Sequence, residues 1–156
     1  MKDGTLCVLY NKEKDQVLLA MKKRGFGVNL WNAPGGKIEP GETPEQNAIR
    51  ETKEEINVKV TKTKPAGIMT FYFPDEKFSP NWKVYIFRAL SWEGEPQESE
   101  EMQPRWFKVS ELPFDQMWPD DYYWLPPVIE DKSVEAEFYL DNNKKLLSHK
   151  IKIIPT

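Results

Sequence analysis

The sequence contains very little cysteine and no long hydrophobic run. Cys7 is the only cysteine among 156 residues, which excludes an internal disulfide and a structural metal site built from cysteines. This scarcity suits a reducing cytosol. The apolar run near the N-terminus is too short for a signal peptide or a membrane span. We therefore expect a soluble, cytoplasmic protein that has no membrane partner.

Basic clusters are absent as well, and histidine occurs once. The formal net charge is −3, and no run of Lys or Arg offers a surface for a nucleic acid polymer. An anionic ligand would therefore need a cation. His149 lies in an alternating stretch near the C-terminus, where we expect a structural role.

The length of the chain predicts one domain, and its aromatic content exceeds what the core of one domain needs. A second domain within 156 residues would be smaller than most that fold alone, so we predict a single domain over residues 1–156. Aromatic residues make up 13% of this polar chain, which is more than a core of this size needs. Stacking on a ligand is one use for the remainder.

Alternating apolar and polar residues predict a chain rich in strands. The expected strands are Thr5–Tyr10, Gln16–Met21, Val58–Val60, Ala66–Phe73, Trp82–Leu90, Arg105–Val109, Val134–Leu140 and Leu146–Ile154. The first two and the last two should form hairpins. A second helix over residues 121–130 is possible, although Pro126 and Pro127 weaken it. Strands mixed with at least one helix indicate the α+β class.

One helix carries clear start and stop signals. Thr43 is a suitable N-cap, Pro44 suits the first helical position, and Gln46 completes a capping box. Asn57 tolerates the left-handed conformation that ends many helices. The sequence therefore predicts a helix over Pro44–Ile56.

Three glutamates on this helix share one side. Glu51, Glu54 and Glu55 are spaced by three and four residues, and each like-charged pair costs roughly 0.2 to 0.5 kcal/mol. They form either a solvated acidic face or a site for a hard cation such as Mg²⁺, which prefers carboxylate oxygen.

The surrounding pattern favours the cation. It reads Gly36-x5-Glu42-x7-Arg50-Glu51-Thr52-x-Glu54-Glu55-x-Asn57-Val58 and resembles the Nudix box, G-x5-E-x7-R-E-U-x-E-E-x-G-U, where U is apolar. Thr52 and Asn57 depart from it, at positions that hold an apolar residue and glycine. The resemblance implies a Nudix hydrolase with an α/β/α sandwich, a mixed β-sheet and the loop-helix-loop of the box.

The same resemblance implies roles for the charged residues. Arg50 would orient Glu51 or Glu42 and would not contact substrate. Water activated by the metal would attack a phosphorus atom of the substrate. The expected cofactor is Mg²⁺, with Mn²⁺ as a substitute, and its implied ligands are Glu51, Glu54, Glu55, Glu101 and the carbonyl of Gly35.

Three further segments resemble the MutT-homologue branch, the oxidised purine nucleoside triphosphatases. They are residues 21–32, 98–107 and 118–124. The branch implies hydrolysis of 8-oxo-dGTP and 2-hydroxy-dATP to the monophosphate and pyrophosphate, which sanitises the nucleotide pool. We expect a monomer that binds this small nucleotide substrate. Alternatives are another nucleotide, such as ADP-ribose, an undamaged dNTP or a dinucleotide polyphosphate, and a non-catalytic nucleotide-binding domain.

The branch also implies which residues hold the substrate. Asn32, Asp120 and Asp121 would bond the base edge, with one proton shared between the aspartates, while Trp118 would stack on the base. Taken alone, residues 118–121 are equally typical of a surface turn. Thr5, or Cys7 in its place, and Lys22 would lie beside the sugar. The apolar lining implied by the resemblance is Phe26, Phe71, Phe73, Met102 and Trp124.

Overall fold

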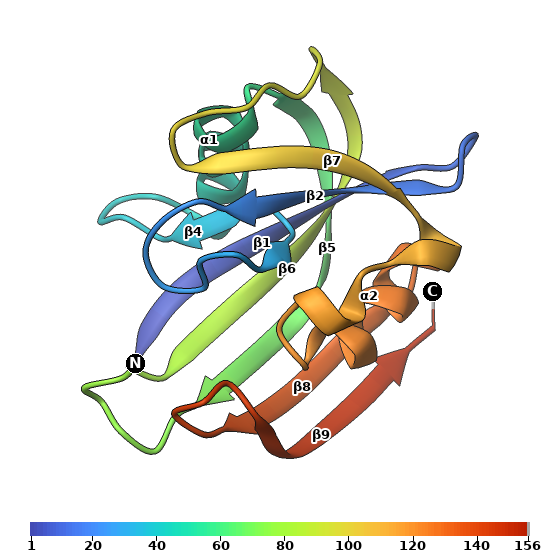
Figure 1. Cartoon of the computed structure of the whole chain (residues 1–156). Helices are drawn as coiled ribbons and strands as arrows, with labels where there is room; N and C mark the ends of the chain where they lie inside the picture. Colours follow the sequence, from blue (N-terminus) through green and yellow to red (C-terminus); the bar gives the residue numbers. More distant parts are fainter. Residues whose placement is uncertain (156) are drawn as a thin grey trace.

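The computed structural model describes residues 1–155, which form strands around two α-helices (Figure 1). The strands are β1 (Lys2–Asn11), β2 (Gln16–Lys22), β3 (Trp31–Asn32), β4 (Gly35–Lys37), β5 (Lys59–Tyr72), β6 (Trp82–Glu93), β7 (Met102–Lys108), β8 (Ser133–Leu140) and β9 (Leu146–Ile154). The helices are α1 (Pro44–Ile56) and α2 (Asp121–Ile129), and two 3-10 turns, Val109–Glu111 and Phe114–Gln116, precede α2.

All strands belong to one mixed sheet. Its order is β3-β2-β1-β6-β5-β8-β9, with β4 paired to β1 and β7 paired to β2. The pairs β1–β6 and β5–β8 are parallel, and the other pairs are antiparallel. The parallel pairing of β1 with β6 places the N-terminal strand in the middle of the sheet.

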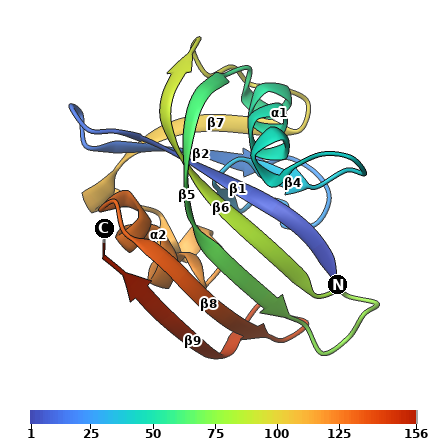
Figure 2. The ribbon, with the colours of Figure 1, turned by 180° about the vertical axis from the view of Figure 1, so that it is seen from behind.

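The two helices cover opposite faces of this sheet (Figures 1 and 2). Successive side chains of a strand point to opposite faces. Val8 accordingly packs into the core under α2, whereas its neighbours Cys7 and Leu9 pack into the core under α1. This arrangement confirms the predicted α+β class and the α/β/α sandwich.

The helix α1 has the bounds and caps that its sequence predicts. The Thr43 hydroxyl accepts a bond from the Gln46 N–H, and the Gln46 side chain accepts one from the Thr43 N–H. Asn57 ends the helix with a φ of 59°. Asn therefore fills the helix-ending position that glycine holds in the Nudix box.

The helix α2 forms although it contains Pro126 and Pro127. Packing compensates for the two lost backbone bonds, because Trp124 is buried. A cation holds its C-terminal end: the buried Arg88 of β6 donates two bonds to the Val128 carbonyl, at 2.9 and 2.6 Å. Burial lowers the pKa of Arg88, yet the guanidinium suits the negative end of a helix.

The strand β5 is longer than predicted. The sequence suggests two strands separated by the polar stretch 61–65, but β5 runs through it. Its pairing with β6 shifts register between Val60 and Lys62, Lys62 and Thr63, and Pro65 and Gly67. These bulges absorb the polar stretch and Pro65 without ending the strand.

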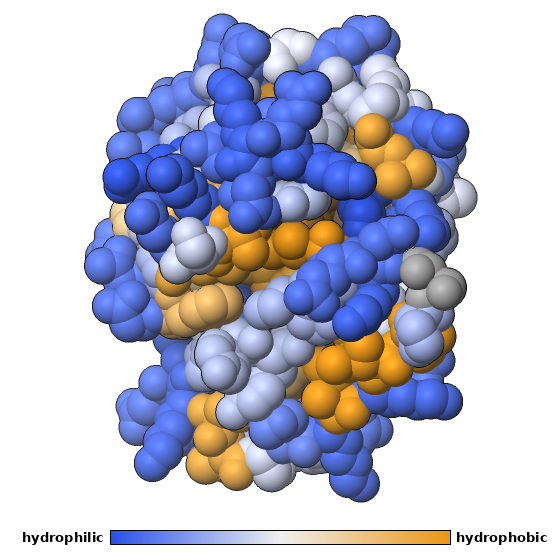
Figure 3. All heavy atoms as spheres, turned by 90° about the vertical axis from the view of Figure 1, so that its right-hand side faces the viewer, coloured by the Kyte–Doolittle hydropathy of each residue, from blue (hydrophilic) through white to orange (hydrophobic). Residues whose placement is uncertain are grey.

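One long edge of the sheet is exposed. β9 is the last strand in the order, and its exposed residues include Lys150, Lys152 and Ile153. On the side that carries the C-terminus, hydrophobic side chains form separate patches on a largely polar surface (Figure 3). No helix within residues 1–155 is long and apolar enough to cross a membrane.

Candidate active site

A cavity of about 390 Å³ opens between the sheet and the segment that leads into α2. It is lined by residues of β1 to β7 together with the loop after β2. The predicted site residues that line it are Thr5, Lys22, Phe26, Asn32, Gly35, Glu55, Phe71, Phe73, Met102, Trp118 and Asp120. The fold thus brings residues from the whole first three quarters of the chain to one place.

Two buried aspartates lie at one end of the cavity. Asp120 and Asp121 are 3% and 1% exposed, and no cation pairs with them in the described residues. The indole N–H of Trp124 lies 2.9 Å from Asp120 Oδ2 and 2.9 Å from Asp121 Oδ1. Burial raises the pKa of Asp120 to about 6 and that of Asp121 well above its usual value. The pair therefore retains a proton more readily than exposed carboxylates do.

Each aspartate also has an unused oxygen. Asp120 Oδ1 and Asp121 Oδ2 are buried and have no hydrogen-bond partner among the described residues. Asp120 lines the cavity, whereas Asp121 and Trp124 lie behind it. The structure thus places Trp124 as a support for the aspartates and not in the lining that was predicted for it. A ligand with N–H donors would satisfy Asp120.

Aromatic rings form the wall beside Asp120. The Phe26 and Trp118 rings lie 5.2 Å apart, and Phe73 meets Trp118 edge-on at 6.4 Å. Phe78, from the loop before β6, packs on Phe26 at 5.4 Å. A Cβ at Gly27 would come within 3.3 Å of the Trp118 indole nitrogen, so glycine leaves room for that ring.

Thr5 lies on the cavity wall, whereas Cys7 does not. Thr5 lines the cavity and donates its hydroxyl proton to Asn47 Oδ1 at 2.5 Å. Cys7 is fully buried in the core under α1, and burial raises the pKa of its thiol to about 12. This geometry favours Thr5 over Cys7 as the residue beside the sugar.

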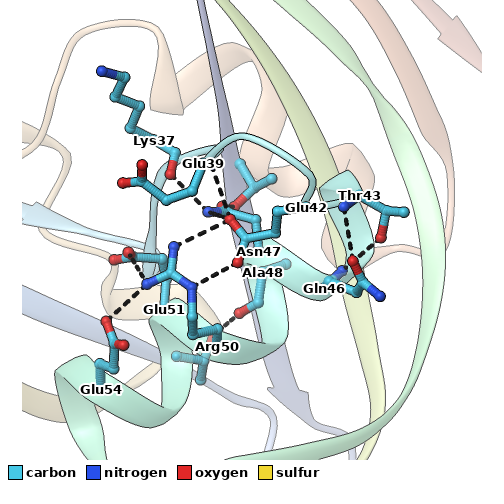
Figure 4. Close-up of polar contacts among 12 residues, drawn as sticks. Lys37, Glu39, Glu42, Thr43, Gln46, Asn47, Ala48, Arg50, Glu51 and Glu54 are labelled. Atoms are coloured by element: carbon cyan, nitrogen blue, oxygen red, sulfur yellow. Dashed lines mark hydrogen bonds and ion pairs between the residues drawn. The ribbon is translucent and has the colours of Figure 1, made fainter.

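Arg50 organises the carboxylates of α1 (Figure 4). Its guanidinium forms two bonds to Glu42, at 2.6 and 3.1 Å, and one bond each to Glu51 and Glu54, at 2.9 Å. The bonds from Arg50 to Glu42, together with those from the Glu39 N–H and the Asn47 side chain, lower the pKa of Glu42 to about 2. Arg50 therefore holds both glutamates that the Nudix resemblance assigns to it.

Glu55 faces the cavity from the other side of α1. It is 2% exposed, and its Oε1 accepts the Gly35 N–H at 3.0 Å. Burial is the main reason that its pKa is raised to about 8. Its Oε2 is buried without a partner in the described residues.

Two glycines allow β4 to approach these groups. A Cβ at Gly36 would lie 2.5 Å from the Glu51 carboxylate, and a Cβ at Gly35 would lie 1.9 Å from the Thr5 carbonyl oxygen. Backbone atoms exclude a side chain at Gly35, whereas a side chain at Gly36 would displace the Glu51 carboxylate. Glycine is therefore required here by close approach, as the Nudix resemblance implies for the backbone beside the phosphates.

The acidic side chains do not form a preassembled metal cage. Within residues 1–155, no three His, Cys, Asp or Glu side chains converge closely enough to hold an ion. Arg50 draws Glu51 and Glu54 to one side, while Glu55 turns to Gly35. The predicted ligands therefore bond different partners and do not converge within residues 1–155.

The residues present nevertheless fit a divalent cation. The unpartnered Glu55 oxygen is the kind of hard ligand that such ions take. Glu51 and Glu101 lie near enough to Glu55 to raise its pKa, which a cation between the three would reverse. The cavity lining includes Glu55 but not Arg50, Glu51, Glu54 or Glu101.

Some residues of the site carry no distinctive sequence signal. Trp82 and Leu30 line the cavity, although the segments around them read as ordinary strand and loop. Asn47 lies on α1 in an unspecified position of the box. An amide in a fully buried helical position is the signal that could have identified Asn47.

Comparison with known proteins places the fold and the box in one family. Residues 1–128 match the NUDIX domain, and the chain belongs to the Nudix family. Hydrolases of this family need a divalent metal ion. The family predicted from the box is confirmed.

The relatives are similar over nearly their whole length. A Danio rerio protein named oxidized purine nucleoside triphosphate hydrolase is 43% identical over 136 residues, which are 87% of this chain and 86% of that protein. The Mus musculus protein of the same name is 40% identical over 141 residues, 90% and 88% of the two chains. The crystal structure of a MutT protein from Bacillus halodurans superposes with a TM-score of 0.84 at 30% identity, covering 97% and 98%.

Proposed function

We propose that this protein hydrolyses oxidised purine nucleoside triphosphates, such as 8-oxo-dGTP and 2-hydroxy-dATP, to the monophosphate and pyrophosphate. The fish and mouse relatives named for this activity support the substrate class. Removing such nucleotides keeps damaged bases out of new DNA. The protein would thus sanitise the nucleotide pool.

One observation carries the proposal: one aspartate of the buried pair and one glutamate of the box line the same cavity. Asp120 and Glu55 both line it. A purine with its edge on Asp120 and its face on Trp118 would direct its phosphates towards α1. A pair that keeps one proton offers a donor as well as acceptors, so it suits the altered donor pattern of an oxidised purine.

We propose Mg²⁺ as the metal, with Mn²⁺ as a substitute. Glu51, Glu54, Glu55 and Glu101 and the Gly35 carbonyl would hold it. When bound, the ion would lower the pKa of a water molecule and neutralise charge on the phosphate oxygens. Hard divalent ions keep several waters and share phosphate oxygens.

The chain's own residues have separate tasks in this reaction. Arg50 holds Glu51 and Glu54 in place through its bonds. The Gly35 N–H fixes the Glu55 carboxyl. Lys22, Asn32, Phe26, Phe71, Phe73 and Met102 would hold the nucleoside, while Asp121 and Trp124 keep Asp120 in position.

A monomer acting in the cytoplasm remains part of the proposal. The separate hydrophobic patches on the side shown in Figure 3 support a monomer, because large self-association surfaces are usually continuous.

The test is kcat/KM for 8-oxo-dGTP, 2-hydroxy-dATP, dGTP and ADP-ribose with Mg²⁺, with products separated by chromatography. We expect a strong preference for an oxidised nucleotide and release of its monophosphate with pyrophosphate. A preference for dGTP or ADP-ribose would assign the protein to another Nudix substrate. Binding without turnover would indicate a non-catalytic domain.

A further inference from the structure

Asn47 is a buried amide at the junction of three parts of the site. It lies on α1, is 0% exposed and does not line the cavity. Its side chain contacts β4 at Lys37 and the loop before α1 at Glu42 (Figure 4). It also contacts β1 at Thr5. A buried amide with every polar atom bonded fixes its partners in register.

The partners determine which way the amide points. Asn47 Nδ2 donates to the Lys37 carbonyl at 2.7 Å and to Glu42 Oε1 at 2.8 Å. Both partners are acceptors, so the nitrogen must face them. Asn47 Oδ1 therefore faces Thr5 and must receive the hydroxyl proton, across 2.5 Å.

This orientation sets the chemistry of the cavity wall. The Thr5 hydroxyl has one proton, and it donates that proton in the hydrogen bond to Asn47 Oδ1. The lone pairs of Thr5 remain for a ligand. Any bond between the Thr5 hydroxyl and a ligand in the cavity must therefore be one that Thr5 accepts, which suits a hydroxyl or N–H of a nucleoside and not a phosphate oxygen.

The other end of Asn47 leads to the carboxylates of α1. Glu42 accepts the amide proton and also the two Arg50 bonds. Arg50 in turn bonds Glu51 and Glu54. A continuous chain of hydrogen bonds thus runs from the cavity wall through Asn47 to the glutamates of the box.

We propose that Asn47 is a positioning residue that acts at both ends of the substrate. Through Thr5 it sets the acceptor that binds the nucleoside, and through Glu42 it braces the Arg50 cluster that serves the phosphates. The inference rests on the proposed function, because it requires that the cavity binds a nucleotide.

A double-mutant cycle separates the two actions. The variants are Asn47→Ala, Thr5→Val and the pair combined, and two quantities are measured for each. The first is the Kd for 8-oxo-dGMP in EDTA, followed by tryptophan fluorescence, which reports the nucleoside end without metal. The second is kcat for 8-oxo-dGTP with Mg²⁺.

The control is Thr52→Val on the same helix. Thr52 is also fully buried, but its hydroxyl donates to the Ala48 carbonyl, at 2.7 Å within α1, and its other polar contact is the core residue Cys7. A loss that follows from disturbing α1 in general should therefore occur in Thr52→Val as well. We expect its Kd and kcat to stay within about twofold of the wild-type values, because no lost bond leads to the cavity.

We expect Asn47→Ala to raise the Kd by about threefold to tenfold and to lower kcat by a similar factor, the usual effect of a lost hydrogen bond. Thr5→Val should raise the Kd alone. In the Thr5→Val background, Asn47→Ala should no longer change the Kd but should still lower kcat. Thr5→Ser, which keeps the hydroxyl, should restore the Kd.

The opposite results would overturn the proposal. A lower melting temperature in Asn47→Ala with unchanged Kd and kcat would reduce Asn47 to a structural role. Additive effects of Asn47→Ala and Thr5→Val on the Kd would remove the link through Thr5. If Asn47→Ala does not fold, equal Kd values for Thr5→Val, Thr5→Ser and the wild type would refute that link.

Failure of the proposed function would be visible separately. It would appear as wild-type protein that binds 8-oxo-dGMP no better than dGMP. The double-mutant cycle would then be measured with the nucleotide that the wild type prefers. The inference would be decided in the same way, by whether the effect of Asn47→Ala on the Kd disappears in the Thr5→Val background.

Discussion

Glu42, which precedes α1, and the aspartates at the start of α2 carry the same chemical group in opposite environments. Glu42 is held by Arg50, and its pKa falls to about 2. Asp120 has no cation, and burial raises its pKa to about 6. Glu42 therefore keeps its negative charge, whereas burial makes the aspartates, like Glu55 of α1, retain a proton more readily.

This difference arises from what surrounds each carboxylate and not from its spacing. Glu54 and Glu55 are adjacent in sequence, as Asp120 and Asp121 are. Arg50 pairs with Glu51 and Glu54, whereas no cation pairs with the aspartates among the described residues and they share the Trp124 N–H. One neutral donor cannot offset two buried charges.

The largest effect is expected for Glu55→Gln. It replaces the unpartnered carboxylate oxygen with an amide and should lower kcat by about a hundredfold or more, since metal ligation is worth several kcal/mol to the transition state. The melting temperature should stay the same or rise, because the neutral amide avoids the cost of a buried charge. Steady-state kinetics and thermal unfolding check this. Near-normal turnover would rule out Glu55 as a ligand.

Asp120→Asn should chiefly affect the choice of base. We expect the ratio of kcat/KM for 8-oxo-dGTP to that for dGTP to fall by about tenfold or more, because the lost carboxylate oxygen leaves a substrate donor unpaired. Parallel assays with both nucleotides measure the ratio. If both activities fell in equal proportion, Asp120 would not be the base reader.

Arg50→Lys should damage the α1 cluster more mildly. Lysine keeps the charge but cannot bond Glu42 twice while also bonding Glu51 and Glu54, so kcat should fall by about tenfold with little change in selectivity. The matched control is Lys53→Gln, since Lys53 bonds only Asn57 at the helix end. If Arg50→Lys changed the preference for 8-oxo-dGTP over dGTP, the Arg50 cluster would also take part in selecting the base.

A further effect is expected in the dependence of stability on pH. A raised folded pKa means that the aspartates take up protons on folding, so their contribution is lost as pH rises from about 4 through about 6. The double variant Asp120→Asn/Asp121→Asn should be more stable than the wild type at pH 7 by about 1 to 3 kcal/mol. Denaturant unfolding from pH 4 to pH 8 tests it. Parallel curves for the two proteins would contradict the raised pKa values.

Features encoded by neighbouring residues could be predicted from the sequence. The helix α1 has its caps at Thr43 and Asn57, within a few residues of the turns that they stabilise. The last hairpin follows from alternation and a turn at residues 141–143. Such signals depend on short-range geometry, which the chain order supplies directly.

Features that need distant partners could not be predicted. The prolines of α2 argue against a helix, but the buried Trp124 and the cap from Arg88 outweigh them. The position of Trp124 behind the aspartates depends on the packing of α2 against the sheet. Asn47 is likewise informative only when Thr5 and Glu42 are known to meet it.

The exposed edge of β9 has a consequence for handling the protein. A nine-residue strand with one free side is a template for pairing with another chain. Lys150 and Lys152 place positive charges along that strand, and two copies approaching edge to edge would repel each other. Acetylating these lysines, or screening them with concentrated salt, would weaken that repulsion and favour aggregation.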